Sequence, residues 1–170
     1  EPYRRQRQMC IRDSDYTALK QLVGRSVQVK EDIVEQDPFE HGIRKALNLG
    51  HTVGHAFESM ALAENRPVLH GYAVAWGIVC ELYLSHLKVG FPKEKMRQTI
   101  QFIKDNYGVF TFDCKKYEQL YAFMTHDKKN TSGTINFTLL KDIGDIRINQ
   151  IADKDTIFEM LDFYRECMGI

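Results

Sequence analysis

The sequence has no excess of charge of either sign. Its 23 lysines and arginines balance 23 aspartates and glutamates, so the formal net charge is zero. A protein that binds nucleic acid or an anionic membrane surface usually carries a basic excess, so neither partner is expected. No apolar run reaches the roughly 18 residues of a membrane span, and the opening residues do not read as a signal peptide. A small molecule or another protein is therefore the expected partner.

Cysteine is scarce and shows no paired spacing. The four cysteines form no C-x-x-C pair, and Cys80 lies in an apolar run where a free thiol packs well. This usage favours a reducing, cytoplasmic location. With 170 residues and 44% apolar content, the chain can bury one sizeable core. The cysteines are Cys10, Cys80, Cys114 and Cys167.

The opening segment, Glu1 to Ser14, differs from the rest. It is basic, lacks apolar periodicity and has no initiating methionine. Back-translation of Met9 to Ser14 as ATG TGT ATA AGA GAC AGn matches a widely used sequencing adapter, so our hypothesis is that residues 1–14 are non-native and that the native domain spans 15–170. A genuine basic tail, or the end of an upstream helix, is the alternative. The nucleotide record would decide between them.

The remaining chain predicts a mainly α fold, a helical bundle with a small β-hairpin near the C-terminus. Apolar residues recur at helical spacing between proline, glycine and capping residues. The segment from about His70 is apolar on nearly all sides and is expected at the buried centre of the bundle. Asp153 is expected to cap the last helix. The predicted helices span about 16–36, 43–63, 70 onward, 92–106, 115–125 and 154–167.

The hairpin follows Asn130. There the apolar period changes from helical spacing to alternation, and Asp142 to Asp145 is expected to turn the chain. The alternating apolar residues are Ile135, Phe137 and Leu139 before the turn and Ile146 and Ile148 after it.

A polar stripe is predicted on one face of the second helix. At about 100° per residue, its members fall within a sector of roughly 60°. Gly50 and Gly54 flank it, each costing about 1 kcal/mol relative to alanine, which makes sense where another backbone or a ligand comes close. The opposite face, including Val53 and Phe57, is expected to pack into the core. The stripe consists of Arg44, Asn48, His51 and His55.

The stripe offers metal or anion chemistry. His51 and His55, four residues apart, can address one metal ion or one anion, and His70 is the natural further ligand if the next helix returns antiparallel. Thr52 stands where an H-E-x-x-H protease has its general base, so that interpretation fails. A lone histidine is more often structural, so the prediction depends on the residues acting together. His41, His86 and His126 lack such company and are interpreted as surface or structural.

These residues and others along the chain resemble those of a known family, the 3-dehydroquinate synthases. The segment N-L-G-H-T-V-G-H, from Asn48 to His55, is the most specific match, and the likeness extends over about 15–170. It implies conversion of 3-deoxy-arabino-heptulosonate 7-phosphate, a sugar phosphate, to 3-dehydroquinate and phosphate, with NAD and a divalent metal, Zn²⁺ or another such as Co²⁺. It also implies homodimers. The other matching runs are Lys30-Glu-Asp-Ile-Val, Asp37, Glu40, Gly42-Ile-Arg44, Leu69-His-Gly-Tyr-Ala-Val and Asp127-Lys-Lys.

The resemblance also assigns roles. His51 and His70 resemble the metal ligands, and His55 and Lys30 the catalytic residues. One lysine of the Asp127 triplet should reach the phosphate, and Lys128 is chosen over Lys129. Spacing alone would leave Lys30 and this triplet as surface charge. The substrate-binding set is Lys30, Arg44, Asn48, His55 and Lys128.

Three features depart from the family pattern. Tyr72 stands where the family commonly has glutamate. The amino-terminal NAD-binding domain has no counterpart, and neither has the linking segment whose glutamate is the third metal ligand. An isolated chain is therefore expected to be inactive.

Three rival interpretations stay open. Another sugar-phosphate cyclase, such as a 2-deoxy-scyllo-inosose synthase, would share fold, metal and cofactor. A metal-dependent polyol dehydrogenase is a more distant rival, against which the spacing from Lys30 to Arg44 argues. A non-catalytic helical module with a structural zinc clip belongs to a different class.

Overall fold

Helices account for most of the structure. The computed structural model describes residues 16–126 and 134–170. The segment Glu1 to Ser14 and the triplet of Asp127, Lys128 and Lys129 lie outside the described residues. The chain divides into two compact units, Glu1–Arg44 and Lys45–Ile170. The domain limits inferred from the sequence stay a prediction.

The first unit contains one long helix, α2 (Tyr16–Gln36), as predicted. No residue of α2 is buried. Its apolar side chains are largely exposed, with Leu22 at 62% and Val27 at 58% of full exposure. Within this unit, α2 therefore gains its stability from its own backbone hydrogen bonds rather than from a core.

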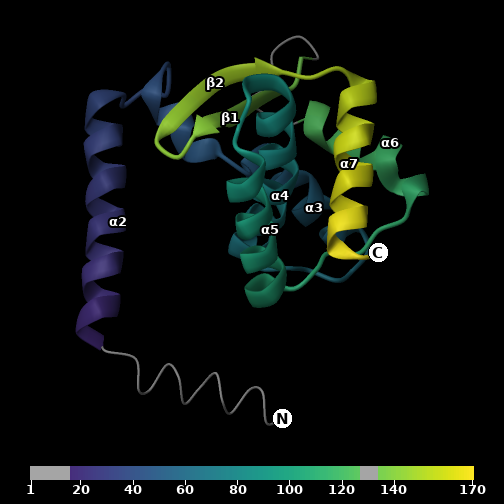
Figure 1. Ribbon diagram of the computed structural model, residues 1–170, viewed down its shortest axis with the longest axis horizontal. Coiled ribbons are helices and arrows are strands. Elements are labelled where there is room, and N and C mark those ends of the chain that lie inside the picture. The colour runs from purple at the N-terminus through teal and green to yellow at the C-terminus, as the bar shows by residue number, and fades with distance from the viewer. Residues whose placement is uncertain (1–15, 127–133) are drawn as a thin grey trace. The chain divides into compact units, whose positions relative to one another are not determined.

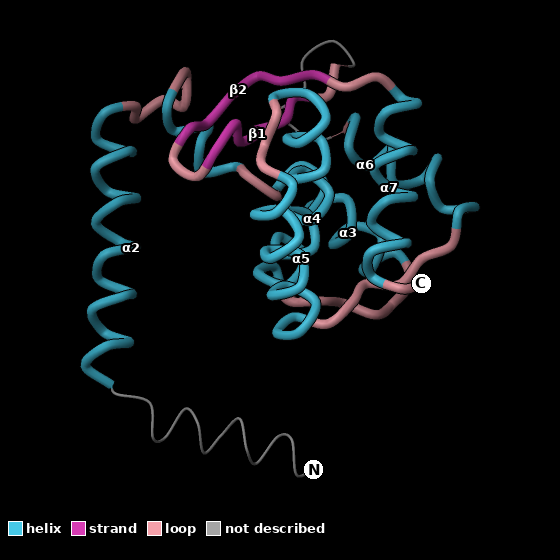
Figure 2. Tube along the Cα trace, in the orientation of Figure 1, coloured by secondary structure: helices cyan, strands magenta, loops and turns pink. Residues whose placement is uncertain are grey.

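The second unit holds the other helices and a hairpin (Figures 1 and 2). The mainly α class with a C-terminal hairpin is confirmed. The α-helices are α3 (His51–Ala63), α4 (His70–Val89), α5 (Lys93–Tyr107), α6 (Tyr117–Thr125) and α7 (Lys154–Met168). The short 3-10 helices are η1 (Ile43–Asn48), at the boundary between the units, and η2 (Cys114–Lys116). The strands are β1 (Asn136–Asp142) and β2 (Asp145–Ile151).

Helix α4 is the centre of this unit, as its apolar sequence predicted. It contacts α3, α5, α7 and β1. Val79, Cys80 and Leu84 on α4 are fully buried. Because α4 packs against all four of these elements, its position fixes theirs.

The hairpin is antiparallel and is fixed to the helices by polar contacts. Its register runs from Asn136 opposite Ile151 to Asp142 opposite Asp145. The Leu140 N–H donates to the Ser85 hydroxyl on α4 at 3.0 Å. Alternation in the sequence therefore predicted the strands, and a buried serine on α4 holds β1 in place.

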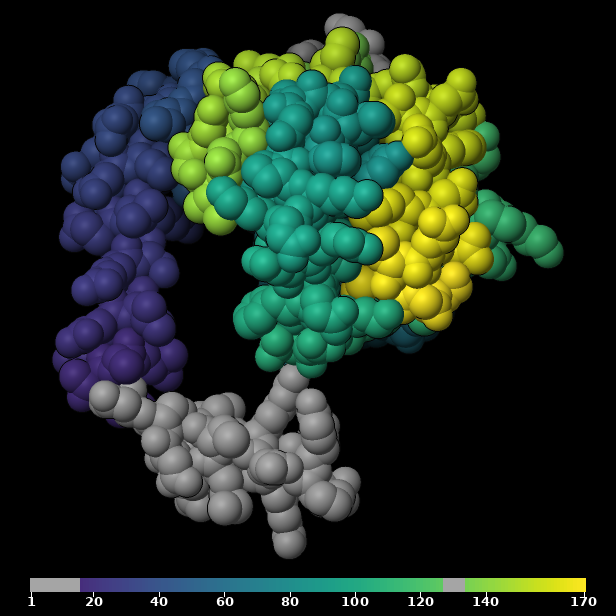
Figure 3. Space-filling model, in the orientation of Figure 1, coloured from purple at the N-terminus to yellow at the C-terminus, as the bar shows by residue number. Residues whose placement is uncertain are grey.

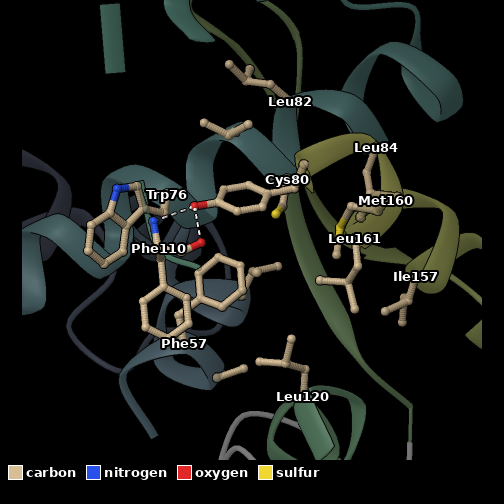
Figure 4. Packing of buried hydrophobic residues seen from close by; sticks show 14 of the residues in the cluster. Phe57, Trp76, Cys80, Leu82, Leu84, Phe110, Leu120, Ile157, Met160 and Leu161 are labelled. Atoms are coloured by element: carbon tan, nitrogen blue, oxygen red, sulfur yellow. Dashed lines mark hydrogen bonds between the residues drawn. The ribbon is translucent and has the colours of Figure 1, made fainter. Parts of the chain in front are cut away.

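An aromatic cluster fills the core between α3 and α7. The ring of Phe57 on α3 lies 5.1 Å from that of Phe110 and 5.3 Å from that of Tyr164 on α7, between ring centres. Figure 4 shows Phe57, Trp76 and Phe110 gathered on one side of this core. The Tyr164 hydroxyl accepts from the Phe110 N–H at 3.1 Å and donates to the Phe110 carbonyl at 3.2 Å. These contacts pack the apolar face of α3 against α7 and the segment around Phe110.

Helix α7 closes the unit. The Asp153 carboxylate accepts from the Thr156 N–H at 2.8 Å, so the predicted cap is confirmed. Figure 3 shows α7 beside α5 on one face of the molecule, and the Lys104 ammonium donates to the Cys167 carbonyl at 3.1 Å between them.

None of the helices in the described ranges combines the length and the apolar content that a membrane span requires.

The expected second helix over 43–63 is wrong in its first part. The chain forms the 3-10 helix η1 over Ile43–Asn48, breaks, and becomes α-helical only at His51. The break falls at Gly50, whose φ of 79° lies in the left-handed region, where glycine is favoured because it has no Cβ. Arg44 and Asn48 therefore do not share a helical face with His51 and His55.

Candidate metal and substrate site

Glycines let α3 and α4 approach backbone to backbone. A Cβ on Gly77 of α4 would lie 2.1 Å from the Gly50 carbonyl oxygen and 2.7 Å from the Gly54 nitrogen. A Cβ on Gly54 would lie 3.0 Å from the Ala73 carbonyl oxygen. The expectation that another backbone or a ligand comes close at Gly50 and Gly54 is confirmed, and the close neighbour is the backbone of α4. Gly50 lies near Gly77 and Gly54 near Ala73, so the two helices run antiparallel.

This antiparallel packing brings three histidines together. The ring centres of His51 and His55 on α3 lie 5.5 Å apart, and His70, the first residue of α4, lies 5.4 Å from His51 and 5.7 Å from His55. The sequence therefore predicted the meeting of these residues correctly. His51 and His55 are half-buried, and His70 is exposed.

Two of these rings have an oxygen acceptor at Nδ1. His51 Nδ1 lies 3.1 Å from the Leu49 carbonyl oxygen, and His70 Nδ1 lies 3.1 Å from a Glu58 carboxylate oxygen. A carbonyl or an ionised carboxylate only accepts, so each hydrogen bond requires the proton on Nδ1. In the neutral imidazole, Nε2 then keeps the lone pair that a metal ion needs. Histidines that bind metals typically have such partners on the other ring nitrogen.

The spacing of the rings also suits a shared metal ion. Two imidazoles on one tetrahedral zinc, each at about 2.1 Å, have ring centres roughly 5 Å apart, and all three histidine pairs lie near this spacing. Within residues 16–126 and 134–170, no group of three or more histidine, cysteine, aspartate or glutamate side chains is arranged as a metal site. His51 and His70 fit as a pair of ligands that a further group would complete.

The other predicted residues lie at the end of η1, in the first unit, or outside the described residues. Asn48 ends η1, three residues before α3 begins, and Arg44 lies in the first unit with Lys30 of α2. Lys30 is exposed. Lys128 lies outside the described residues. The structure thus brings together the histidines of the second unit, and the roles of Asn48, Arg44, Lys30 and Lys128 stay predictions.

Asp37 shapes the chain around Arg44 within the first unit. Its carboxylate accepts from the N–H groups of His41, Gly42 and Arg44 at 2.9, 2.7 and 3.1 Å. Partial burial opposes ionisation of Asp37, yet these three hydrogen bonds outweigh it and lower its pKa. The Arg44 guanidinium donates to the Pro38 carbonyl at 2.7 Å. Asp37, which occurs in the family-like run, therefore holds the backbone of Arg44.

Tyr72, which stands where the family commonly has glutamate, packs against other aromatic rings. Its ring lies 6.0 Å from that of Trp76 and 5.4 Å from that of Tyr107, edge to face in both cases. Such pairs contribute stability beyond simple burial. Tyrosine at this position joins α4 to the end of α5.

Two carboxylates at the site were missed by the sequence reasoning. Glu58 holds His70, and its position three residues after His55 on the same helix was an available signal. Glu81 on α4 is fully buried and accepts from the Gly50 N–H at 2.6 Å. The only signal for Glu81 was one acidic residue within the apolar sequence of α4.

Comparisons with known proteins identify a matching family, related sequences and a similar structure. Residues 3–130 match the family described as 3-dehydroquinate synthase C-terminal. The 3-dehydroquinate synthase of Parabacteroides distasonis is 62% identical over 156 residues, 92% of this chain and 44% of that protein. The 3-dehydroquinate synthase of Leptospira interrogans is 44% identical over 140 residues, 79% of this chain and 38% of that protein. This chain therefore spans less than half of these relatives.

A solved structure shares the fold. It is a 2-deoxy-scyllo-inosose synthase complexed with carbaglucose-6-phosphate, NAD⁺ and Co²⁺, with a TM-score of 0.69 and 20% sequence identity over 88% of this chain and 41% of that one. At this identity the likeness shows the fold alone. Together with the family match, which covers most of the sequence, it places the convergent histidines in a known scaffold, and the chain belongs to the 3-dehydroquinate synthase C-terminal family.

Proposed function

We propose that this chain supplies the metal- and substrate-binding part of a 3-dehydroquinate synthase. The full enzyme would convert 3-deoxy-arabino-heptulosonate 7-phosphate to 3-dehydroquinate and phosphate. The observation that carries the proposal is the convergence of His51, His55 and His70, two of them with an acceptor at Nδ1. The names of the two relatives support the choice of reaction.

His51 and His70 would hold a divalent metal ion, zinc or cobalt, through Nε2. When bound, the ion would act as a Lewis acid on the carbonyl and hydroxyl oxygens of the substrate. Glu58 keeps the His70 ring in the required tautomer, and the Leu49 carbonyl does the same for His51. A catalytic zinc normally has three protein ligands, so the full-length protein would supply another, and this chain alone would bind the metal weakly.

His55 would serve the substrate rather than the metal. It lies one helical turn after His51, and its ring stacks on His70 with an interplanar angle of 30°. When protonated, His55 can donate a hydrogen bond to a phosphate oxygen, and it can transfer a proton while the phosphate leaves the substrate. Asn48, three residues before α3 begins, would bind a substrate hydroxyl. Lys30, Arg44 and Lys128 would make further contacts to the substrate. Lys30 would also have a catalytic role.

The isolated chain is proposed to be inactive. NAD would be held mainly by the part of the relatives that this chain does not span. The solved cyclase, which binds NAD⁺ and Co²⁺, supports this cofactor pair. The full-length enzyme is expected to be a cytoplasmic homodimer. Because that structure shows the fold alone, it does not favour the rival cyclase reaction, and product analysis would separate the two.

The test uses a fusion protein, in which the amino-terminal part of the Parabacteroides distasonis relative precedes this chain. We expect His51→Ala to remove bound zinc, measured by elemental analysis. Asn48→Ala should keep the zinc and lose turnover, because its role is limited to the substrate. The two variants are matched, since each truncates one polar side chain near the start of α3.

Two results would contradict these assignments. Stoichiometric zinc in the purified His51→Ala fusion protein would show that His51 is not a ligand. Full turnover by Asn48→Ala would remove Asn48 from the substrate site. His86→Ala serves as a control, because the His86 ring bonds the Phe91 carbonyl at the other end of α4 and should leave both measurements unchanged.

A further inference from the structure

Glu81 is a buried carboxylate on the central helix. It is 0% exposed, and burial of a carboxylate is costly unless hydrogen bonds compensate for it. One carboxylate oxygen accepts from the Gly50 N–H at 2.6 Å, and the other has a longer contact of 3.5 Å with the Val53 N–H. Both donors belong to the start of α3. Glu81 therefore supplies from a neighbouring helix the cap that Gly50, which has no side chain, does not provide.

The start of α3 is also where a charge of this sign is most stable. The first N–H groups of a helix have no partner within the helix, and the helix dipole places partial positive charge there. The peptide N–H of Gly50 is held against α4, where Gly77 leaves room for the Gly50 carbonyl. The Glu81 carboxylate therefore lies at the positive end of α3, beside the point where the backbones of α3 and α4 approach each other.

One peptide unit connects Glu81 to His51. The N–H of Gly50 and the carbonyl of Leu49 belong to the same planar group, whose atoms move together. Glu81 accepts from the nitrogen side of that group at 2.6 Å, and His51 Nδ1 lies 3.1 Å from its oxygen. A carboxylate that binds the N–H also polarises the group and strengthens its carbonyl as an acceptor.

We propose that Glu81 is a positioning residue for the metal site: it fixes the Leu49–Gly50 peptide plane, and the Leu49 carbonyl in turn holds the His51 ring with its proton on Nδ1. This inference rests on the proposed role of His51 as a metal ligand. Glu81 itself touches neither metal nor substrate. Glu81 acts on His51 through one peptide group, whereas Glu58 bonds the His70 ring directly.

The experiment measures Co²⁺ affinity and the Co²⁺ absorption spectrum of the fusion protein with Glu81→Gln. Outer partners of metal ligands typically change affinity by about 10–100-fold, and a loss in this range, with a changed spectrum, is the expected result. The matched control is Ser85→Ala, which removes a fully buried hydroxyl one turn along α4. That hydroxyl accepts from the Leu140 N–H and donates to the backbone carbonyl of Glu81, not to its carboxylate. The Ser85→Ala substitution should lower stability and leave Co²⁺ affinity unchanged.

Three outcomes overturn the inference. The first is wild-type affinity in a folded Glu81→Gln protein, and the second is an equal loss of affinity in Ser85→Ala, which would reveal a general effect of stability. The third needs no variant: nitrogen NMR of metal-free wild-type protein should find the neutral His51 protonated at Nδ1, and protonation at Nε2 contradicts the proposal even if Glu81→Gln fails to fold. If the wild-type fusion protein binds no Co²⁺, the proposed function fails instead.

Discussion

Replacement of Gly77 by alanine should separate the two helices that carry the histidines. The new Cβ would lie 2.1 Å from the Gly50 carbonyl oxygen, and real Cβ atoms essentially never come within 3.0 Å of another heavy atom, so the two backbones must move apart. Neither obstacle is a flexible side chain, since the next nearest atom is the Gly54 nitrogen at 2.7 Å. The strain therefore falls on the packing of α3 against α4.

The magnitude follows from two opposing effects. Alanine gains about 1 kcal/mol over glycine in helix propensity, and overpacking in a well-packed core typically costs about 1–3 kcal/mol, occasionally more. Because this clash is between backbones, we place the cost at or above the top of that range and expect a net loss of about 2 kcal/mol or more. For a protein of this size that lowers the thermal midpoint by roughly 4–8 °C.

The assay is thermal unfolding followed by circular dichroism, with Gly71→Ala as the matched control. Gly71 is in the first turn of the same helix, and a Cβ there has no heavy atom within 4 Å, so its midpoint should stay or rise. A Gly77→Ala protein that unfolds at the wild-type temperature would refute the close approach of α3 and α4.

Three further outcomes are expected. Burial and the hydrogen bond to Glu159 raise the pKa of Tyr83 from 10.0 to about 12. The stability that the protonated tyrosine contributes is therefore complete below pH 10 and is lost as the pH rises to 12. Urea unfolding of Tyr83→Phe should not show this loss. Glu58→Gln should weaken Co²⁺ binding by the fusion protein about tenfold, measured by titration, because His70 loses its carboxylate partner, and unchanged affinity would argue against that role. Deletion of residues 1–14 should leave the thermal midpoint within error, because their sequence lacks an apolar face, and a drop of several degrees would show that they belong to the fold.

Local pattern predicted much of the fold. The apolar run of α4, the Asp153 cap of α7 and the alternation around Phe137 each depend on neighbouring residues, so the helices and hairpin could be placed from sequence. The break at Gly50 could not, since apolar periodicity continues through it and the left-handed conformation is set by its contact with α4.

The site shows the same division. Histidine spacing and the short connection to α4 predicted that His51, His55 and His70 meet. The role of Glu81 depends on a hydrogen bond across 31 positions of sequence, and only the packing of two helices brings its partners together. Spacing along one helix also overstated the place of Arg44, because the chain is not α-helical there.

The most direct test of the central claim is a phosphate-release assay with excess NAD and zinc. It compares the isolated chain with the fusion protein on 3-deoxy-arabino-heptulosonate 7-phosphate, with 3-dehydroquinate identified as the product. We predict turnover by the fusion protein and none by the isolated chain, because the proposed ligands His51 and His70 would leave the metal site incomplete and the sequence contains no glycine-rich motif of the kind that holds NAD. Turnover by the isolated chain, or a folded, metal-loaded fusion protein that forms no 3-dehydroquinate, would contradict the account.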